Sequence, residues 1–279
     1  MNEILKKTQK AEAVVEYVIH NPAVAAKARP GQFVILIIKE GGERVPFTIT
    51  DYDREKGTIT LLVQTVGETT LEMSKMKEGD SLYAFVGPLG NATDLSEYNK
   101  VCLVGGGIGA AVVFPQAKLL KSQGKSVDVI LGARDKNLLM YVDEFQAIAD
   151  NVYLVTDNGT AGEKGFVTDK LKALIDGGAQ YDVVFAVGPM IMMKVVSDLT
   201  RGYKIKTLVS MNTIMIDGTG MCGGCRVTVG GKRLYACVDG PEFDGHEVDY
   251  SEALNRLTLF KEQEKEAYCR LTGEKHGKN

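Results

Sequence analysis

The residue pattern changes near Asn99, and this change constrains the fold more than any other feature of the chain. Before it, short β-rich segments are separated by turn signals such as Arg29-Pro30-Gly31, which predicts a small antiparallel barrel. After it, short apolar strands alternate with helical stretches, which predicts a parallel sheet with both faces covered. A chain of 279 residues has room for such a pair of domains.

The predicted elements follow from this pattern. In the barrel we expect strands at 13–19, 32–38, 44–50, 58–65 and 81–86, and a helix at 68–76. In the parallel-sheet part we expect strands at 101–104, 127–131, 152–155, 183–187 and 207–209, and helices at 110–123, 167–175 and 191–200. Beyond residue 210, glycine and cysteine dominate, a hairpin is expected around Gly230 and Gly231, and a charged helix at 250–268. The domain prediction is therefore a barrel at 1–95, an α/β domain at 96–210 and a small module at 211–279.

The charge and hydropathy of the chain disfavour two classes of partner. The formal net charge is −3, so no broad electrostatic attraction to nucleic acid or to an anionic membrane is expected. No apolar stretch approaches the roughly 20 residues of a membrane helix, and the polar, lysine-rich start does not resemble a signal peptide. We therefore expect a cytoplasmic protein.

The strongest local signal is a cluster of cysteines near the C-terminus. Five cysteines, an odd number, argue against a disulfide framework. The C-x4-C-x2-C…C spacing of plant-type [2Fe–2S] ligands is matched by Asp217, Cys222, Cys225 and Cys237, with aspartate in the first position. Glycines between them let the chain wrap closely around a cluster. The alternatives are a zinc site completed by Asp217 or His246, and free thiols.

Glycine-rich loops at predicted strand ends indicate a dinucleotide site. One loop between a predicted strand and a predicted helix contains Gly105, Gly106, Gly107 and Gly109. Backbone N–H groups and the helix dipole at such a position favour binding of a diphosphate. The alternative is an ordinary tight strand–helix turn, because the spacing is not a strict G-x-G-x-x-G. Two further loops of this kind support the dinucleotide interpretation, and they contain Gly188, Pro189, Met190 and Arg134.

Two segments of the barrel could hold a flat ring and its phosphates. Arg44, Pro46, Phe47 and Thr48 place a cation, an aromatic ring and a hydroxyl on one strand. Gly67, Thr69 and Thr70 would begin a helix whose free N–H groups suit a diphosphate. Considered alone, these segments are better explained by Phe47 as a core residue, Arg44 as a rim residue and a simple capped helix.

Taken together, these motifs resemble the ferredoxin–NADP reductase superfamily, and within it the electron-transfer subunits of class B dihydroorotate dehydrogenases. The resemblance covers nearly the whole chain. It implies that the strand with Arg44, Pro46, Phe47 and Thr48 binds FAD, with Arg44 at the diphosphate. It also implies that the turn with Gly67, Thr69 and Thr70 binds the FAD diphosphate, and that Gly105 to Gly109 bind NAD(H) or NADP(H).

The first predicted cluster ligand departs from the dihydroorotate-linked subunits, which have four cysteines. Asp217 resembles instead the small subunits of NADH-dependent reduced-ferredoxin:NADP⁺ oxidoreductases, a family of electron-bifurcating enzymes. That resemblance implies hydride exchange between NAD(H) and FAD, single-electron exchange with the cluster, and a large partner subunit carrying FAD and [4Fe–4S] clusters, where ferredoxin would react. The alternatives are a dihydroorotate dehydrogenase subunit and a non-catalytic zinc-binding regulatory module.

Overall fold

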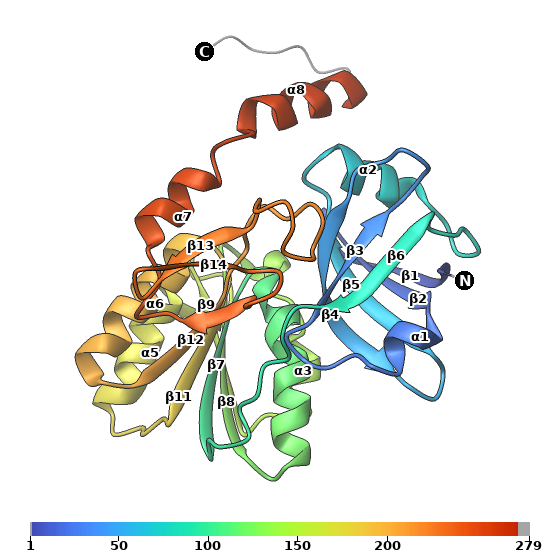
Figure 1. The fold of residues 1–279 in the computed structure, drawn as a ribbon. Coiled ribbons are helices and arrows are strands. Elements are labelled where there is room, and N and C mark those ends of the chain that lie inside the picture. The colour runs from blue at the N-terminus through green and yellow to red at the C-terminus, as the bar shows by residue number, and fades with distance from the viewer. Residues whose placement is uncertain (1, 273–279) are drawn as a thin grey trace.

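The computed structural model describes residues 2–272 and contains two large sheets that lie side by side (Figure 1). The first is six-stranded and antiparallel, in the order β1-β2-β5-β4-β3-β6. Its strands are β1 (Glu3–Ala11), β2 (Val14–His20), β3 (Phe33–Ile37), β4 (Val45–Asp53), β5 (Thr58–Gln64) and β6 (Ala84–Leu89). A bridge between Glu3 and Ser81 brings the start of β1 to the entry of β6, so the sheet curls into a barrel. Two helices accompany it, α1 (Pro22–Ala25) and α2 (Glu68–Lys75).

The second sheet has seven strands in the order β10-β9-β8-β7-β11-β12-β15 and is parallel except for β15. Its strands are β7 (Lys100–Gly106), β8 (Ser126–Ala133), β9 (Asn151–Thr156), β10 (Glu163–Lys164), β11 (Val183–Val187), β12 (Lys206–Ser210) and β15 (Glu242–Asp244). Its helical elements are α3 (Gly109–Ser122), η1 (Lys136–Leu138), α4 (Val142–Gln146), α5 (Val167–Asp176) and α6 (Met190–Tyr203).

Alternate residues of the parallel strands point to opposite faces, and each face has its own core. Val101, Leu103 and Phe185 face α3 and α4, while Cys102, Val104 and neighbouring residues face α5 and α6. Both cores continue into the barrel through residues such as Phe33 and Leu62. The barrel and the parallel sheet are therefore joined by packed apolar side chains. The interior of the barrel forms a third core.

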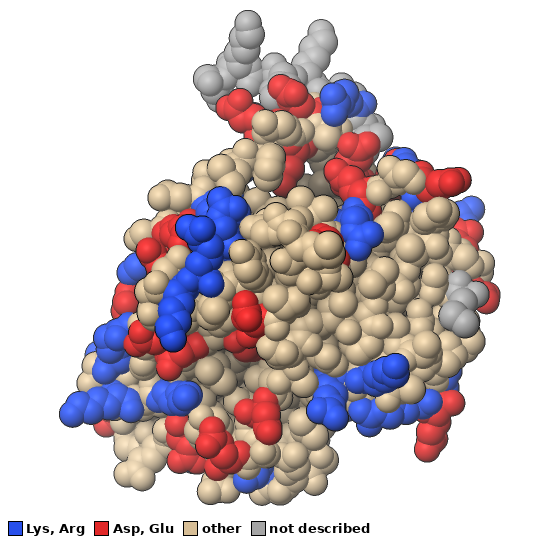
Figure 2. Space-filling model, in the orientation of Figure 1, with Lys and Arg blue, Asp and Glu red and all other residues tan. Residues whose placement is uncertain are grey.

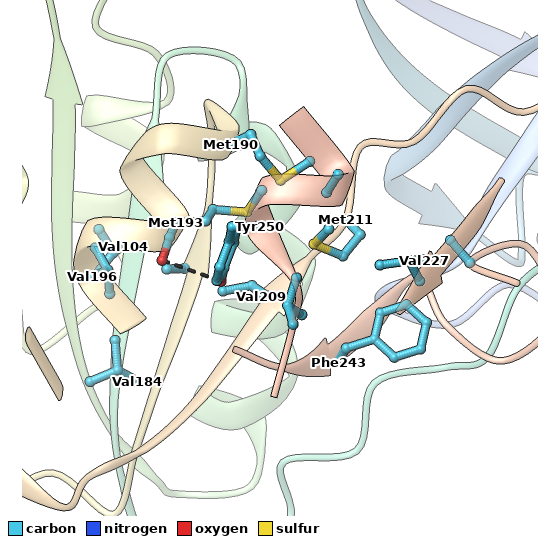
Figure 3. Packing of buried hydrophobic residues seen from close by; sticks show 14 of the residues in the cluster. Val104, Val184, Met190, Met193, Val196, Val209, Met211, Val227, Phe243 and Tyr250 are labelled. Atoms are coloured by element: carbon cyan, nitrogen blue, oxygen red, sulfur yellow. Dashed lines mark hydrogen bonds between the residues drawn. The ribbon is translucent and has the colours of Figure 1, made fainter. Parts of the chain in front are cut away.

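The C-terminal segment packs on the end of the parallel sheet. It contains the hairpin β13 (Arg226–Val229) and β14 (Lys232–Tyr235), then β15, α7 (Tyr250–Arg256) and α8 (Lys261–Thr272). Figure 3 shows Tyr250 among Met190, Met193 and Met211, with its hydroxyl 3.4 Å from the carbonyl oxygen of Met193. This anchor holds α7 against α6, and the chain then continues into α8, which approaches α2 of the barrel (Figure 1).

The predicted barrel and parallel sheet are confirmed, and most predicted elements lie within a few residues of their expected bounds. The prediction missed the elements β1, α1, η1, α4, β10 and β15, and one predicted helix is wrong. The strand β1 was not expected, because it is a polar edge strand in which only Ile4 is fully buried, so it lacks an apolar signal. The single helix expected at 250–268 is wrong: the chain forms α7 and α8, separated at 257–260. The predicted domain bounds stay a prediction. Among the described residues, no helix is long and apolar enough to cross a membrane.

Candidate functional site

Three glycine-bearing loops meet at the carboxyl end of the parallel sheet. The amide of Gly107, which has φ of +56°, donates to the carbonyl of Gly132 over 2.8 Å, joining the loops after β7 and β8. A Cβ atom on Gly188 would lie 3.1 Å from Cα of Gly106, so the loop after β11 approaches equally closely. A Cβ on Gly109 would meet the carbonyl oxygen of Val187 at 2.1 Å. Only glycine permits this approach, which leaves bare backbone where a dinucleotide binds in such sheets.

The other residues predicted for this site differ in what they can contact. Arg134 is exposed, and within the described part of the chain its guanidinium has no hydrogen-bonding or ion-pairing partner, so it is free to meet a phosphate. Pro189 precedes the first residue of α6 and leaves its amide end open. The side chain of Met190 packs in the core beside Met193 (Figure 3), so only its backbone can face a ligand.

The predicted flavin strand lies open on the barrel. Residues 44–48 are all partly exposed, whereas Ile49 and Thr50 are buried. Phe47 packs against the barrel core only in part. Arg44 turns towards the C-terminal module: its Nε donates to the carbonyl of Ile216 at 2.8 Å, and Nη2 donates to the carbonyl of Asp217 at 3.2 Å. A guanidinium has five N–H groups, so donors remain for a phosphate.

The second predicted FAD segment lies beside this strand. The hydroxyl of Thr69, in the first turn of α2, donates to the carboxylate of Glu43 next to Arg44. The hydroxyl of Thr70 accepts from the amides of Val66 and Gly67, each at 3.0 Å, and so holds the turn that begins α2. The structure therefore brings together the two barrel segments that the sequence separates by about twenty residues.

The predicted cluster ligands lie in and beside one loop, residues 216–225, which we call the cysteine loop. The carboxylate of Asp217 accepts from the amides of Thr219 at 2.9 Å, Met221 at 3.1 Å and Cys222 at 2.7 Å. These hydrogen bonds, the one from Thr219 most of all, lower the pKa of Asp217, so its side chain is ionised. Two oxygens offer about four lone-pair positions, so three amides leave one for a metal.

The three cysteines of the predicted ligand set differ in burial and in their contacts. Sγ of Cys225 and Sγ of Cys237 are 3.2 Å apart and buried, and Cys222 is exposed. The amide of Cys237 points at Sγ of Cys225 and the amide of Gly224 at Sγ of Cys222, each at 3.4 Å. Such N–H···S contacts are typical of cluster sulfurs. Burial, and then Cys225, raise the pKa of Cys237 to about 12, so a bound cation must displace its proton.

The structure does not draw all four predicted ligands to one point: among the described residues, no three His, Cys, Asp or Glu side chains are arranged to hold a metal ion. His246, the alternative zinc ligand, is engaged elsewhere. Its Nε2 lies 3.0 Å from the hydroxyl of Thr200 and its Nδ1 lies 4.0 Å from Asp244. The four-ligand set Asp217, Cys222, Cys225 and Cys237 stays a prediction.

Three residues at this site carried no sequence signal. Arg226 and Arg256 donate to carbonyls of the cysteine loop, but lone arginines in a charged segment look like surface residues. Glu242 accepts from the hydroxyl of Ser210 at 3.1 Å and lies against Gly31 of the barrel. Burial raises its pKa to about 8, so it is largely protonated at neutral pH. The contacts of Arg256 and Glu242 depend on the packing of distant segments, whereas that of Arg226 is local.

Comparison with known proteins finds close relatives over the whole chain. Residues 212–249 match the family described as the iron-sulfur cluster binding domain of dihydroorotate dehydrogenase B. The chain is 50% identical over 271 residues to the dihydroorotate dehydrogenase B (NAD⁺) electron transfer subunit homolog of Thermotoga maritima, covering 97% of this chain and 95% of that one. A Clostridium perfringens dihydroorotate dehydrogenase B electron transfer subunit is 36% identical, covering 81% of this chain and 89% of that one.

Solved structures of similar fold include related oxidoreductases. A chain of an NADH-dependent reduced ferredoxin-NADP oxidoreductase, studied for flavin-based electron bifurcation, superposes with a TM-score of 0.92 at 48% identity, covering 98% of both chains. A ferredoxin NADP⁺ reductase from Neisseria gonorrhoeae with bound FAD and NADP superposes with a TM-score of 0.60 at 15% identity, covering 76% of this chain and 91% of that one. The second likeness shows the fold alone.

Proposed function

This chain belongs to the family of dihydroorotate dehydrogenase B electron-transfer subunits and their homologues, and we propose that it is the small subunit of an electron-bifurcating, NADH-dependent ferredoxin:NADP⁺ oxidoreductase. As a member of that family it is an oxidoreductase subunit that uses FAD, a nicotinamide dinucleotide and an iron–sulfur cluster. We assign the barrel to FAD, the glycine loops to the dinucleotide and the cysteine loop to a [2Fe–2S] cluster.

One observation carries the proposal: Arg44 binds the cysteine loop directly from the predicted flavin strand. The cofactors supply hydride and single-electron chemistry when bound. The residues of this chain hold the cofactors in position relative to one another. Gly106, Gly107 and Gly188 leave room for the dinucleotide at the sheet edge, and the core between the sheets fixes that edge relative to the barrel. Arg44 then sets the distance from the flavin strand to the cysteine loop.

Aspartate at position 217 separates this proposal from a dihydroorotate-linked role. A thiolate is expected there in the dihydroorotate-linked subunits, and a carboxylate is a harder ligand that donates less charge to iron. We propose that the partner is a large subunit with its own FAD and [4Fe–4S] clusters, and that ferredoxin reacts on that subunit.

We expect the purified single chain to oxidise NADH with artificial acceptors but not to reduce ferredoxin. The reason is that beyond the proposed [2Fe–2S] ligands only Cys102 and Cys269 remain, too few for a [4Fe–4S] cluster. The measurement is anaerobic NADH oxidation with ferricyanide and, separately, with ferredoxin, using the chain alone and with its co-purified partner. Ferredoxin reduction by the single chain would refute the bifurcating-subunit proposal. A partner that oxidises dihydroorotate would favour the alternative.

A further inference from the structure

Three arginines donate hydrogen bonds to carbonyls of the cysteine loop, and we call them the arginine clamp. Arg44, just before β4, binds the carbonyls of Ile216 and Asp217 at the start of the loop. Arg256, the last residue of α7, donates to the carbonyl of Gly224 at 2.9 Å. Arg226, the first residue of β13, donates to the carbonyl of Gly223 at 3.4 Å. Both ends of the loop are therefore held.

The position of Arg256 follows from how α7 is anchored. Asp249 caps the helix by accepting from the amide of Glu252 at 3.0 Å. The hydroxyl of Tyr250 lies 2.9 Å from that of Ser197 on α6, and both Tyr250 and Ala253 are buried. Arg256 follows Ala253 by three residues and so lies on the same face of the helix. The packing of α7 on α6 thus directs Arg256 at the cysteine loop.

Two arginines of the clamp, Arg226 and Arg256, lie close together without an ion-pair partner among the described residues. Figure 2 shows Lys and Arg side chains gathered over β13, β14 and α7. Within residues 2–272, no ion pair involves Arg44, Arg226 or Arg256. Arg226 and Arg256 line one small cavity, and Glu252 attracts Arg256 only from a longer distance. Burial and the nearby charge of Arg226 lower the pKa of Arg256. Like charges held together in this way favour an anion close by.

A [2Fe–2S] cluster with three thiolates and a carboxylate is such an anion. The oxidised cluster with four anionic ligands carries net negative charge, and one-electron reduction makes it more negative. Arg256 also lies near enough to Cys225 to interact with it electrostatically. Fixed positive charge favours the more negative state, and hydrogen bonds and charge around the sulfurs set the potential of such clusters.

We propose that the arginine clamp positions the cysteine loop and raises the reduction potential of its cluster, with Arg256 as the residue that contributes most from the module itself. This inference rests on the proposed cluster at Cys222, Cys225 and Cys237. Arg256 acts through the loop carbonyl and through its charge, so it is a positioning residue. Arg44 adds a second effect, because it connects the loop to the flavin strand.

The test is potentiometric EPR of the holoprotein carrying Arg256→Gln, Arg256→Lys or the control Arg233→Gln. Arg233 lies on β14, is exposed and is near enough to Arg256 to lower the pKa of Arg256, but donates no hydrogen bond to the cysteine loop within the described residues. It therefore controls for a nearby positive charge that lacks the hydrogen bond to the loop. At the potential that half-reduces the wild-type cluster, we expect Arg256→Gln to lower the ratio of reduced to oxidised cluster at least threefold. Arg256→Lys should recover most of that loss, and Arg233→Gln should shift the ratio by less than half as much.

An unchanged ratio in Arg256→Gln, or an equal shift in Arg233→Gln, would overturn the inference. If Arg256→Gln does not retain iron, Arg256→Lys becomes the deciding variant. A wild-type ratio of reduced to oxidised cluster together with changed g-values would support the clamp. An EPR spectrum of Arg256→Lys identical to that of the wild-type protein would contradict it. Absence of any [2Fe–2S] signal from the wild-type protein would instead refute the proposed function.

Discussion

Replacing Arg44 by alanine should empty most of the flavin site. Arg44 is the cation of the open strand at residues 44–48, and a planar bidentate donor suits diphosphate oxygens. Losing charge-assisted hydrogen bonds of this kind costs about 2 kcal/mol, or roughly a thirtyfold weaker affinity for FAD. The measurement is the FAD content per chain after purification, followed by a titration of the apoprotein with FAD.

The structure adds a second expected effect of this substitution. Because Arg44 also binds the carbonyls of Ile216 and Asp217, Arg44→Ala should keep its iron but change the EPR line shape of the cluster. Arg54→Ala is the matched control: it lies on the same barrel, stacks on Tyr52 at 4.9 Å and donates to the carbonyl of Ala28. Wild-type FAD content in Arg44→Ala, or equal loss in Arg54→Ala, would contradict the assignment of Arg44 to the flavin.

Asp217→Cys should keep the cluster, change its g-values and lower its midpoint potential. A carboxylate donates less charge to iron than a thiolate, and less donating ligands raise the potential, as histidine does in Rieske centres. A raised potential would suit a cluster that passes electrons towards NAD⁺. The measurement is potentiometric EPR of the purified variant beside the wild-type protein.

The alternative is that Asp217 only holds the turn, since its carboxylate already accepts three amides of its own loop. In that case water or another group completes the cluster, and the cysteine variant keeps the wild-type spectrum and potential. Asp94→Cys is a suitable control. Asp94 also caps a local turn, by accepting from the amide of Ser96 at 2.9 Å, but it lies outside the cysteine loop. That variant should leave the EPR signal unchanged.

Local patterns predicted most of the fold, because its strands are short apolar runs and its turns carry glycine. The strands with Val101 to Val104 and Val183 to Val187 are buried on both faces, and buried strands of this kind give a clear signal. The polar edge strand β1 and the break between α7 and α8 gave no such sequence signal. Both depend on pairing or packing with segments far away in the sequence.

In the candidate site, too, local features were predictable from the sequence and long-range contacts were not. The spacing of Cys222, Cys225 and Cys237 is local, so it was visible in the sequence. The approach of Arg44 to a loop more than 170 residues away was not visible, nor was the placement of Arg256 by the packing of α7 on α6. Contacts between segments that distant arise from the tertiary fold, which residue spacing does not encode.

The most direct test of the electron-transfer assignment is an anaerobic titration of the purified chain with NADH, followed in one sample by visible absorption and EPR. We expect a yellow-brown protein with FAD and equal amounts of iron and acid-labile sulfide. NADH should bleach the flavin absorption and produce the EPR signal of a reduced [2Fe–2S] cluster. A colourless protein that contains zinc and does not respond to NADH would contradict the account and support a zinc-binding regulatory module.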